Sequence, residues 1–138
     1  MPSVFLDSNV LVYAATTKAS EPRKWKRAID VMQANDFGLS GHVLAEFVSV
    51  VRRKARPPLS DDELDGWLNR LGVLEIAPVD AGLVRRGLAL SRHYKVAYYD
   101  GAILAAAERL GCGTVLSEDM ADGRTYGSVT VRNPFKET

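Results

Sequence analysis

Four acidic residues, Asp7, Glu46, Asp100 and Asp119, lie beside apolar segments of this chain, where a negative charge requires an explanation. Bringing several ionised carboxylates into one partly buried place is costly unless shared protons or a bound cation compensate for their charge. Carboxylate oxygens are the ligands that Mg²⁺ and Mn²⁺ prefer, and such ions activate water and stabilise the leaving oxygen of a phosphodiester. The pattern points to metal-assisted hydrolysis, in which the carboxylates hold the metal and do not themselves attack.

Two of these acids follow short apolar runs that are typical of buried strands. Asp7 comes directly after residues 3–6, and Asp119 comes shortly after residues 113–117. Ligands of parallel α/β sheets bind in the crevice beyond the carboxyl ends of the strands. If these two strands are neighbours, both carboxylates lie at that edge. Each acid taken alone is equally compatible with an ordinary turn or helix N-cap.

The other two acids are expected on helices. Glu46 lies at the border of the apolar stripe of a helix predicted over 42–55, where a solvated rim residue is the ordinary alternative. Asp100 shares a helix face with Ile103, which predicts a carboxylate that points inward, and Gly101 beside it lets another element come close. The alternative for Asp100 is an N-cap aspartate with the helix beginning after it.

The elements that must position these acids alternate between short apolar runs and longer amphipathic segments. Strands are predicted over 3–6, 37–40, 73–77, 113–117 and 128–132, and helices over 9–16, 21–35, 42–55, 60–72, 80–94 and 99–110. Such alternation is typical of an α/β fold in which right-handed crossovers place helices on both faces of a parallel sheet. We expect a single domain over residues 1–138, with a central sheet of about four to five strands.

The composition is ordinary for a globular protein: 138 residues, 46% hydrophobic, 25% charged, net charge +1. This balance alone indicates neither a nucleic acid nor a membrane partner. A single cysteine, Cys112, excludes an internal disulfide, and neither a signal peptide nor an apolar run of about 20 residues is seen. We therefore expect a cytoplasmic protein that has no membrane partner.

Several chemistries are disfavoured by what the sequence offers. No cluster of histidines and cysteines suggests zinc, and His42 and His93 stand too far apart to suggest a metal-free ribonuclease with two histidines. No nucleophile motif, Walker loop or G-x-G-x-x-G is present. Basic residues cluster at 23–27 and 52–56, which fits phosphate contacts but also ordinary solvated helix faces.

Four segments of the chain together resemble the PIN domain, specifically the VapC-type toxins of VapBC toxin–antitoxin modules. The segments are "FLDSNVLVYA", "LAEFVSVVRRK", "YYDGAILAAAERLGC" and "VLSEDMADGRTYGSVTVRNPF". The likeness covers essentially the whole chain, with four acids in the family's order and each in its own apolar context.

The resemblance implies an acidic metal pocket in a central sheet flanked by helices, an α/β/α sandwich. Its catalytic and metal-binding residues would be Asp7, Glu46, Asp100 and Asp119, and its supporting residues Ser8, Asn9, Ser117 and Asp122. Whether Asp122 takes part in metal binding stays open.

The resemblance also implies a function. Similar proteins are endoribonucleases that use Mg²⁺ or Mn²⁺, cleave RNA such as tRNA or rRNA, form homodimers and are inhibited by a VapB-type antitoxin. Two alternatives remain: a catalytically inactive PIN-like module that only binds RNA or protein, and a phosphoacceptor signalling domain. The second fits less well, because the first acid stands alone and Glu46 is expected on a helix. A related enzyme class, the aspartyl-phosphate phosphatases, requires a second aspartate two positions after the first, where this chain has Asn9.

Overall fold

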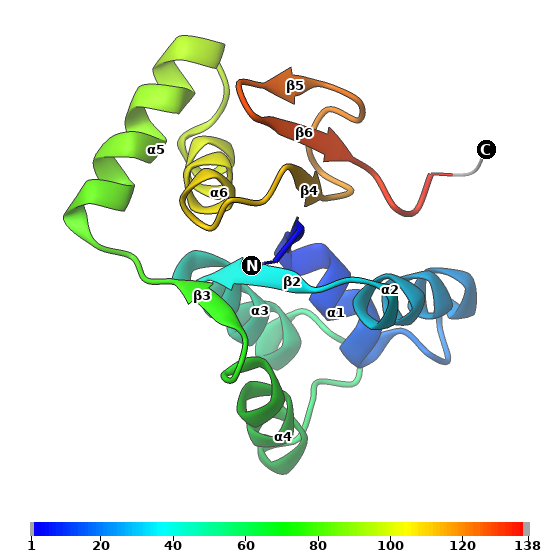
Figure 1. Cartoon of the computed structure of the whole chain (residues 1–138). Helices are drawn as coiled ribbons and strands as arrows, with labels where there is room; N and C mark the ends of the chain where they lie inside the picture. Colours follow the sequence, from blue (N-terminus) through cyan, green and yellow to red (C-terminus); the bar gives the residue numbers. More distant parts are fainter. Residues whose placement is uncertain (1, 137–138) are drawn as a thin grey trace.

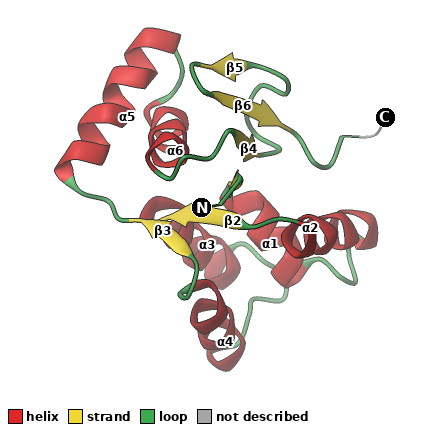
Figure 2. Ribbon diagram, in the orientation of Figure 1, coloured by secondary structure: helices red, strands yellow, loops and turns green. Residues whose placement is uncertain are grey.

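The computed structural model describes residues 2–136, in which helices and strands alternate along the chain (Figures 1 and 2). The helices are α1 (Ser8–Thr16), α2 (Pro22–Ala34), α3 (Gly41–Arg53), α4 (Asp61–Leu71), α5 (Ala81–Tyr94) and α6 (Tyr98–Arg109). The strands are β1 (Val4–Leu6), β2 (Phe37–Ser40), β3 (Glu75–Ala77), β4 (Thr114–Leu116), β5 (Thr125–Tyr126) and β6 (Val129–Arg132). Every element predicted from the sequence is present, with ends that differ by at most two residues.

The strands form one sheet in the order β3-β2-β1-β4-β6-β5. All neighbouring pairs are parallel except β5 with β6. From β1 the chain builds outward through β2 to β3, then crosses back to place β4 on the other side of β1. The strand order therefore reverses between β1 and β4, and in open α/β sheets such a reversal opens a crevice at the carboxyl ends of the two strands.

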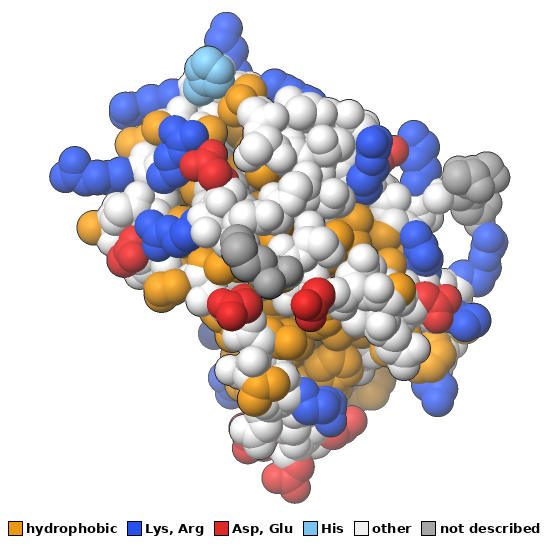
Figure 3. All heavy atoms as spheres, in the orientation of Figure 1, with side chains coloured by type: hydrophobic (Ala, Val, Ile, Leu, Met, Phe, Trp, Pro, Cys, Tyr) orange, Lys and Arg blue, Asp and Glu red, His pale blue; other side chains and the backbone are white. Residues whose placement is uncertain are grey.

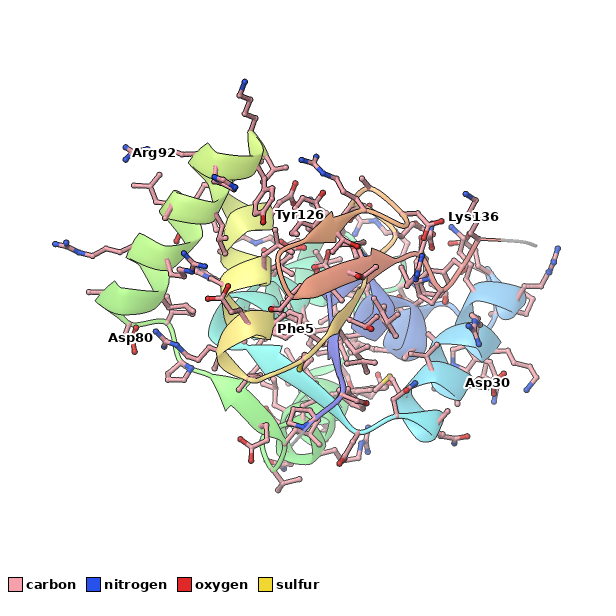
Figure 4. All side chains as sticks on the ribbon, turned by 45° about the horizontal axis from the view of Figure 1, so that its top comes forward. Phe5, Asp30, Asp80, Arg92, Tyr126 and Lys136 are labelled. Carbon is pink, nitrogen blue, oxygen red and sulfur yellow. The ribbon has the colours of Figure 1, made fainter. Side chains whose placement is uncertain are left out.

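The helices cover both faces of the sheet, as the predicted α/β/α sandwich requires. Figure 1 shows α1, α2, α3 and α4 on one side of the sheet and α5 and α6 on the other. The central strand β1 is buried along its whole length, and Phe5 at its middle is fully buried near the centre of the molecule (Figure 4). Burial on both faces explains why this strand is continuously apolar rather than alternating.

Two local features differ from the sequence-based predictions. The strand β5 was not predicted; with two residues it is too short to show a pattern, and it pairs antiparallel with β6 at the sheet edge. The described sheet thus has one strand more than predicted. Helix α6 begins at Tyr98 with Ala97 as its N-cap, so Asp100 lies inside the first turn and is not itself the cap.

Candidate active site

The carboxyl ends of β1 and β4 lie side by side, as the prediction for Asp7 and Asp119 required. Leu6 pairs with Leu116 in the parallel ladder, and the backbone N–H of Asp7 donates to the carbonyl of Leu116 at 3.0 Å. The loop after β4 carries Asp119 to the same edge. The two acids therefore meet where the strand order reverses.

Asp7 is the most buried acid of this group, with 6% of its surface exposed. Its carboxylate accepts hydrogen bonds from the Ser117 hydroxyl and from the backbone N–H of Ser8, both at 2.7 Å. The second bond makes Asp7 the N-cap of α1. Burial nevertheless raises the pKa of Asp7 above 3.8, and the negative charges of Glu46 and Asp119 raise it further, outweighing the two hydrogen bonds.

The side-chain amide of Asn9 joins the first and last acids. Its Nδ2 donates to Asp7 Oδ2 at 3.3 Å and to Asp119 Oδ2 at 3.2 Å, and its Oδ1 accepts from the backbone N–H of Glu118 at 3.3 Å. The fully buried hydroxyl of Ser117 accepts from the backbone N–H of Asp119 at 3.1 Å. Asn9 and Ser117 thus tie the start of α1 to the loop after β4.

Glu46 and Asp100 adjoin this pair from α3 and α6. The Ser8 hydroxyl donates to Glu46 Oε1, which holds the Glu46 side chain at the start of α1. Partial burial raises the pKa of Asp100 above 3.8, and the charge of Asp119 raises it further. Glu46 acts electrostatically on Asp7, and Asp119 acts on both Asp7 and Asp100. The four predicted acids are therefore electrostatically coupled.

The donor chemistry of this group fits a hard divalent cation, because every candidate ligand is an oxygen atom and the negative charges are in excess. The geometry is less complete. Within the part of the chain that the structure describes, no three Asp, Glu, His or Cys side chains are arranged so that they could hold a metal ion. Glu46 is instead engaged by Ser8, and Asn9 lies between Asp7 and Asp119.

The contacts of Asp122 in the structure are with the segment after β6. Its carboxylate accepts from the backbone N–H of Asn133 at 2.8 Å and pairs with Lys136 Nζ at 3.3 Å. These contacts hold the pKa of Asp122 below 3.8. Asp122 therefore fixes the segment after β6, a role that its neighbours in sequence did not reveal.

Comparison with known protein families identifies the family of this chain. The model of the PIN domain family matches residues 4–121, which include all four acids. The chain belongs to the PIN domain family. A comparison with curated proteins gave no match.

Solved structures agree with this fold. The PIN domain described here superposes on Mycobacterium tuberculosis VapC20, a Sarcin-Ricin loop cleaving toxin, with a TM-score of 0.66, 19% identity, and coverage of 85% of this chain and 92% of that one. It is similar to a toxin–antitoxin complex from Klebsiella pneumoniae (TM-score 0.70, 17% identity, 96% and 98% covered). It is also similar to VapBC2 from Rickettsia felis bound to a promoter DNA fragment, with a TM-score of 0.62, 20% identity, and coverage of 94% of this chain and 97% of that one.

A network of Tyr13, Lys24 and Glu118 supports the site of this PIN domain and was missed by sequence reasoning. The Tyr13 hydroxyl donates to Glu118 Oε1 at 2.6 Å, and Lys24 Nζ contacts Glu118 Oε2 at 2.8 Å. The backbone N–H of Glu118 is the one that donates to Asn9. Tyr13 follows Asn9 by one helical turn, a spacing that could have signalled it, but nothing in the sequence links Lys24 to the site.

We expect Glu118→Gln to lower the free energy of unfolding by about 1 kcal/mol at pH 7, because a charge-assisted pair is lost from a partly buried place. Burial raises the pKa of Glu118, but hydrogen bonds from Lys24 and Tyr13 outweigh it and leave the pKa below 4.5. The stabilisation is therefore fully present above about pH 4.5 and is lost as the pH falls through the folded-state pKa. Urea unfolding of both proteins across this range measures the difference.

The matched control is Asp30→Asn. Asp30 pairs with Lys26 within α2 at 3.3 Å, but the side chains are 47% and 73% exposed, so we expect no measurable change in stability. An equal effect of the two substitutions, or a Glu118 effect that persists at acid pH, would contradict the role assigned to the network.

Proposed function

We propose that this PIN domain is an endoribonuclease that depends on Mg²⁺ or Mn²⁺ and acts as the toxin of a VapBC-type toxin–antitoxin module. The observation that carries the proposal is the set of four coupled carboxylates at the reversal of strand order, with the pKa of Asp7 raised. Excess negative charge around the buried carboxylate of Asp7 favours binding of a cation. The names of similar structures, a toxin that cleaves the Sarcin-Ricin loop and two toxin–antitoxin assemblies, support the biological role.

The residues of this chain would divide the work as follows. Asp7, Asp100, Asp119 and Glu46 would hold the metal, which supplies Lewis-acid activation of water and charge stabilisation at the scissile phosphate when bound. Ser117 and Asn9 orient the Asp7 carboxylate through the hydrogen bonds described above. Ser8 donates to one oxygen of Glu46, Oε1, and the other oxygen, Oε2, would be available to a metal. The backbone of RNA would find positive charge on the surface, since Figure 3 shows Lys and Arg side chains over α5 and around α2.

The proposal extends to partners and location. We infer a homodimer that works in the cytoplasm on single-stranded or looped RNA such as tRNA or rRNA, inhibited by a VapB-type antitoxin. Among the described residues, no helix is both long and apolar enough to cross a membrane. Co-purification with an antitoxin encoded beside the gene would support the toxin role.

One observation favours a second candidate function, a PIN module that binds RNA or protein without cleaving it. In the described residues the acids do not form a ready metal-binding group. An inactive module would show RNA or protein binding with no cleavage under any metal condition.

The deciding experiment is an RNA-cleavage assay with purified protein. We expect cleavage with added Mn²⁺ or Mg²⁺ and at least a hundredfold loss of rate in excess EDTA, because the bound metal supplies the activated water. Cleavage at an unchanged rate in EDTA would refute metal dependence. Binding without any cleavage would favour the inactive module.

A further inference from the structure

A pocket of about 340 Å³ opens beside two of the four acids, between α3 and α6. Asp7 and Glu46 form its acidic side, and His42, Tyr99 and Ile103 form part of its apolar and aromatic side. The volume falls within the range of small-ligand sites in proteins. A molecule in this pocket would touch the acids and the aromatic wall at once.

Tyr99 is an exposed aromatic residue whose ring is nevertheless held in place. The residue is 65% exposed, unusually high for so large a side chain. Its ring makes edge contacts with His42 (centroids 5.6 Å apart, planes at 90°) and with Tyr98 (5.3 Å, 67°). These contacts restrict the ring without covering it, so a ligand that binds to the ring meets a surface already set in position.

His42 packs its ring against Tyr99, while its Nδ1 makes no hydrogen bond. That nitrogen is buried without a hydrogen-bond partner, and it is the one such side-chain atom among the described residues. A buried polar atom without a partner destabilises the fold, so a histidine at this position requires an explanation. The contact between the two rings supplies one, because His42 holds the Tyr99 ring in place.

The chemistry of the walls selects the kind of ligand. Two carboxylates and no lysine or arginine are found among the described residues that line the pocket, so a bare phosphate would be repelled. A neutral planar ring fits, because aromatic side chains stack on the faces of nucleobases in single-stranded RNA whatever the base. Asp7 and Glu46 are also the proposed metal-binding residues, which places such a base on a nucleotide next to the scissile phosphate.

We propose that Tyr99 is a stacking residue of a nucleobase subsite, and that a base flanking the cleavage site packs on its exposed face. The proposal rests on the nuclease function proposed above. It makes Tyr99 a determinant of substrate affinity rather than of the chemical step, with His42 as the residue that positions its ring.

The test is cleavage kinetics with a single-stranded RNA that the wild-type protein cleaves. We expect Tyr99→Ala to raise KM about tenfold and to leave kcat within about threefold, because a stacking contact and not a metal ligand is lost. Tyr99→Phe and Tyr99→Trp should keep KM near the wild-type value, which a structural defect could not explain. Val73→Ala, at a site 84% exposed on the α4–β3 connection, is the matched control and should change nothing.

Abasic substrates identify the partner of Tyr99. In the wild-type protein, removing the base that stacks on Tyr99 should raise KM as much as Tyr99→Ala does. In the Tyr99→Ala variant, the same abasic RNA should give no further rise in KM. If the effects of Tyr99→Ala and of base removal on KM are additive at every position, no base stacks on Tyr99 and the subsite is wrong. If Tyr99→Ala leaves KM unchanged but weakens antitoxin binding, the pocket serves a protein partner instead.

The nuclease proposal and the subsite fail in different ways. If the wild-type protein cleaves no RNA, the nuclease proposal fails, and fluorescence of RNA containing 2-aminopurine then tests stacking in EDTA. Quenching that is present with the wild-type protein and lost with Tyr99→Ala supports the subsite, and quenching that is equal in both proteins overturns it.

Discussion

Asp7→Asn is expected to lower the rate of RNA cleavage by about a thousandfold or more, the scale on which an enzyme responds to the loss of a central electrostatic group. Asparagine keeps the size of the side chain and an oxygen that accepts the N–H of Ser8, so α1 retains its N-cap. It removes the negative charge that we propose to bind the metal, and it puts an NH₂ group in place of the oxygen that accepts hydrogen bonds from Ser117 and Asn9. The loss should appear in kcat and in kcat/KM alike, because the contact serves the transition state and not substrate binding alone.

The same substitution should make the metal-free protein more stable. The pKa of Asp7 is raised above 3.8 in the folded protein, by burial first and then by the charges of Glu46 and Asp119, so the folded state binds this proton more tightly than the unfolded state. Stability therefore falls as the pH rises from 3.8 through the raised pKa, and the whole cost is present at neutral pH. Asparagine carries no charge and avoids this cost.

Urea unfolding in EDTA at neutral and acid pH measures the effect. We expect Asp7→Asn to be more stable than the wild-type protein at pH 7, with a difference that shrinks as the pH falls toward 3.8. Asp65→Asn, on the exposed side of α4, removes one charge outside the site and should change neither stability nor cleavage. Full cleavage by Asp7→Asn, or a loss of stability equal to that of a core mutant, would contradict both roles assigned to Asp7.

Much of the site follows from the sequence because strand ends can be located from short apolar runs. The run before Asp7 and the run over 113–117 predicted two buried strands, which the structure pairs in parallel where the strand order reverses. The resemblance to VapC-type toxins added Ser8, Asn9 and Ser117. In the structure these three residues form hydrogen bonds with the acids of the site. Their roles in metal binding and catalysis stay predictions.

Other features depend on long-range contacts that leave no local pattern. Lys24 reaches Glu118 across 94 positions of the sequence, and the two residues look like ordinary surface charges when read alone. The exposure of Tyr99 left no local signal either, since two adjacent tyrosines begin α6 and only Tyr99 is exposed. The contacts of Asp122 are equally hidden, because nothing in the sequence shows its ion pair with Lys136.

Gly101 shows how the packing of two helices positions an acid of the site. It lies next to Asp100 in α6, where α6 crosses α5, and the sequence suggested that this glycine lets another element come close. A Cβ atom at Gly101 would collide with the carbonyl oxygen of Gly87 and lie 2.9 Å from the backbone nitrogen of Ser91. Both atoms belong to the backbone of α5 and cannot move aside as a flexible side chain would, so the close approach requires glycine.

Gly101→Ala is therefore expected to lower the free energy of unfolding by about 3 kcal/mol, at the upper end for overpacking. Gly66→Ala is the matched control: Gly66 also lies in a helix, but its nearest neighbour is the end of the flexible Arg70 side chain at 3.9 Å. There alanine should stabilise by about 1 kcal/mol through its higher helix propensity. Urea unfolding of the two variants should give changes of opposite sign, and stabilisation by both would show that helix propensity outweighs the contact between α5 and α6.

The folded fraction of Gly101→Ala should also cleave RNA more slowly. Moving α6 away from α5 shifts Asp100 relative to Asp119, whose charge now acts on it, and small displacements of catalytic groups cost large factors in rate. Cleavage measured well below the unfolding transition separates this loss from unfolding itself. A variant that is destabilised but fully active would show that the position of Asp100 tolerates the shift, and the link between helix packing and the acidic site would then be wrong.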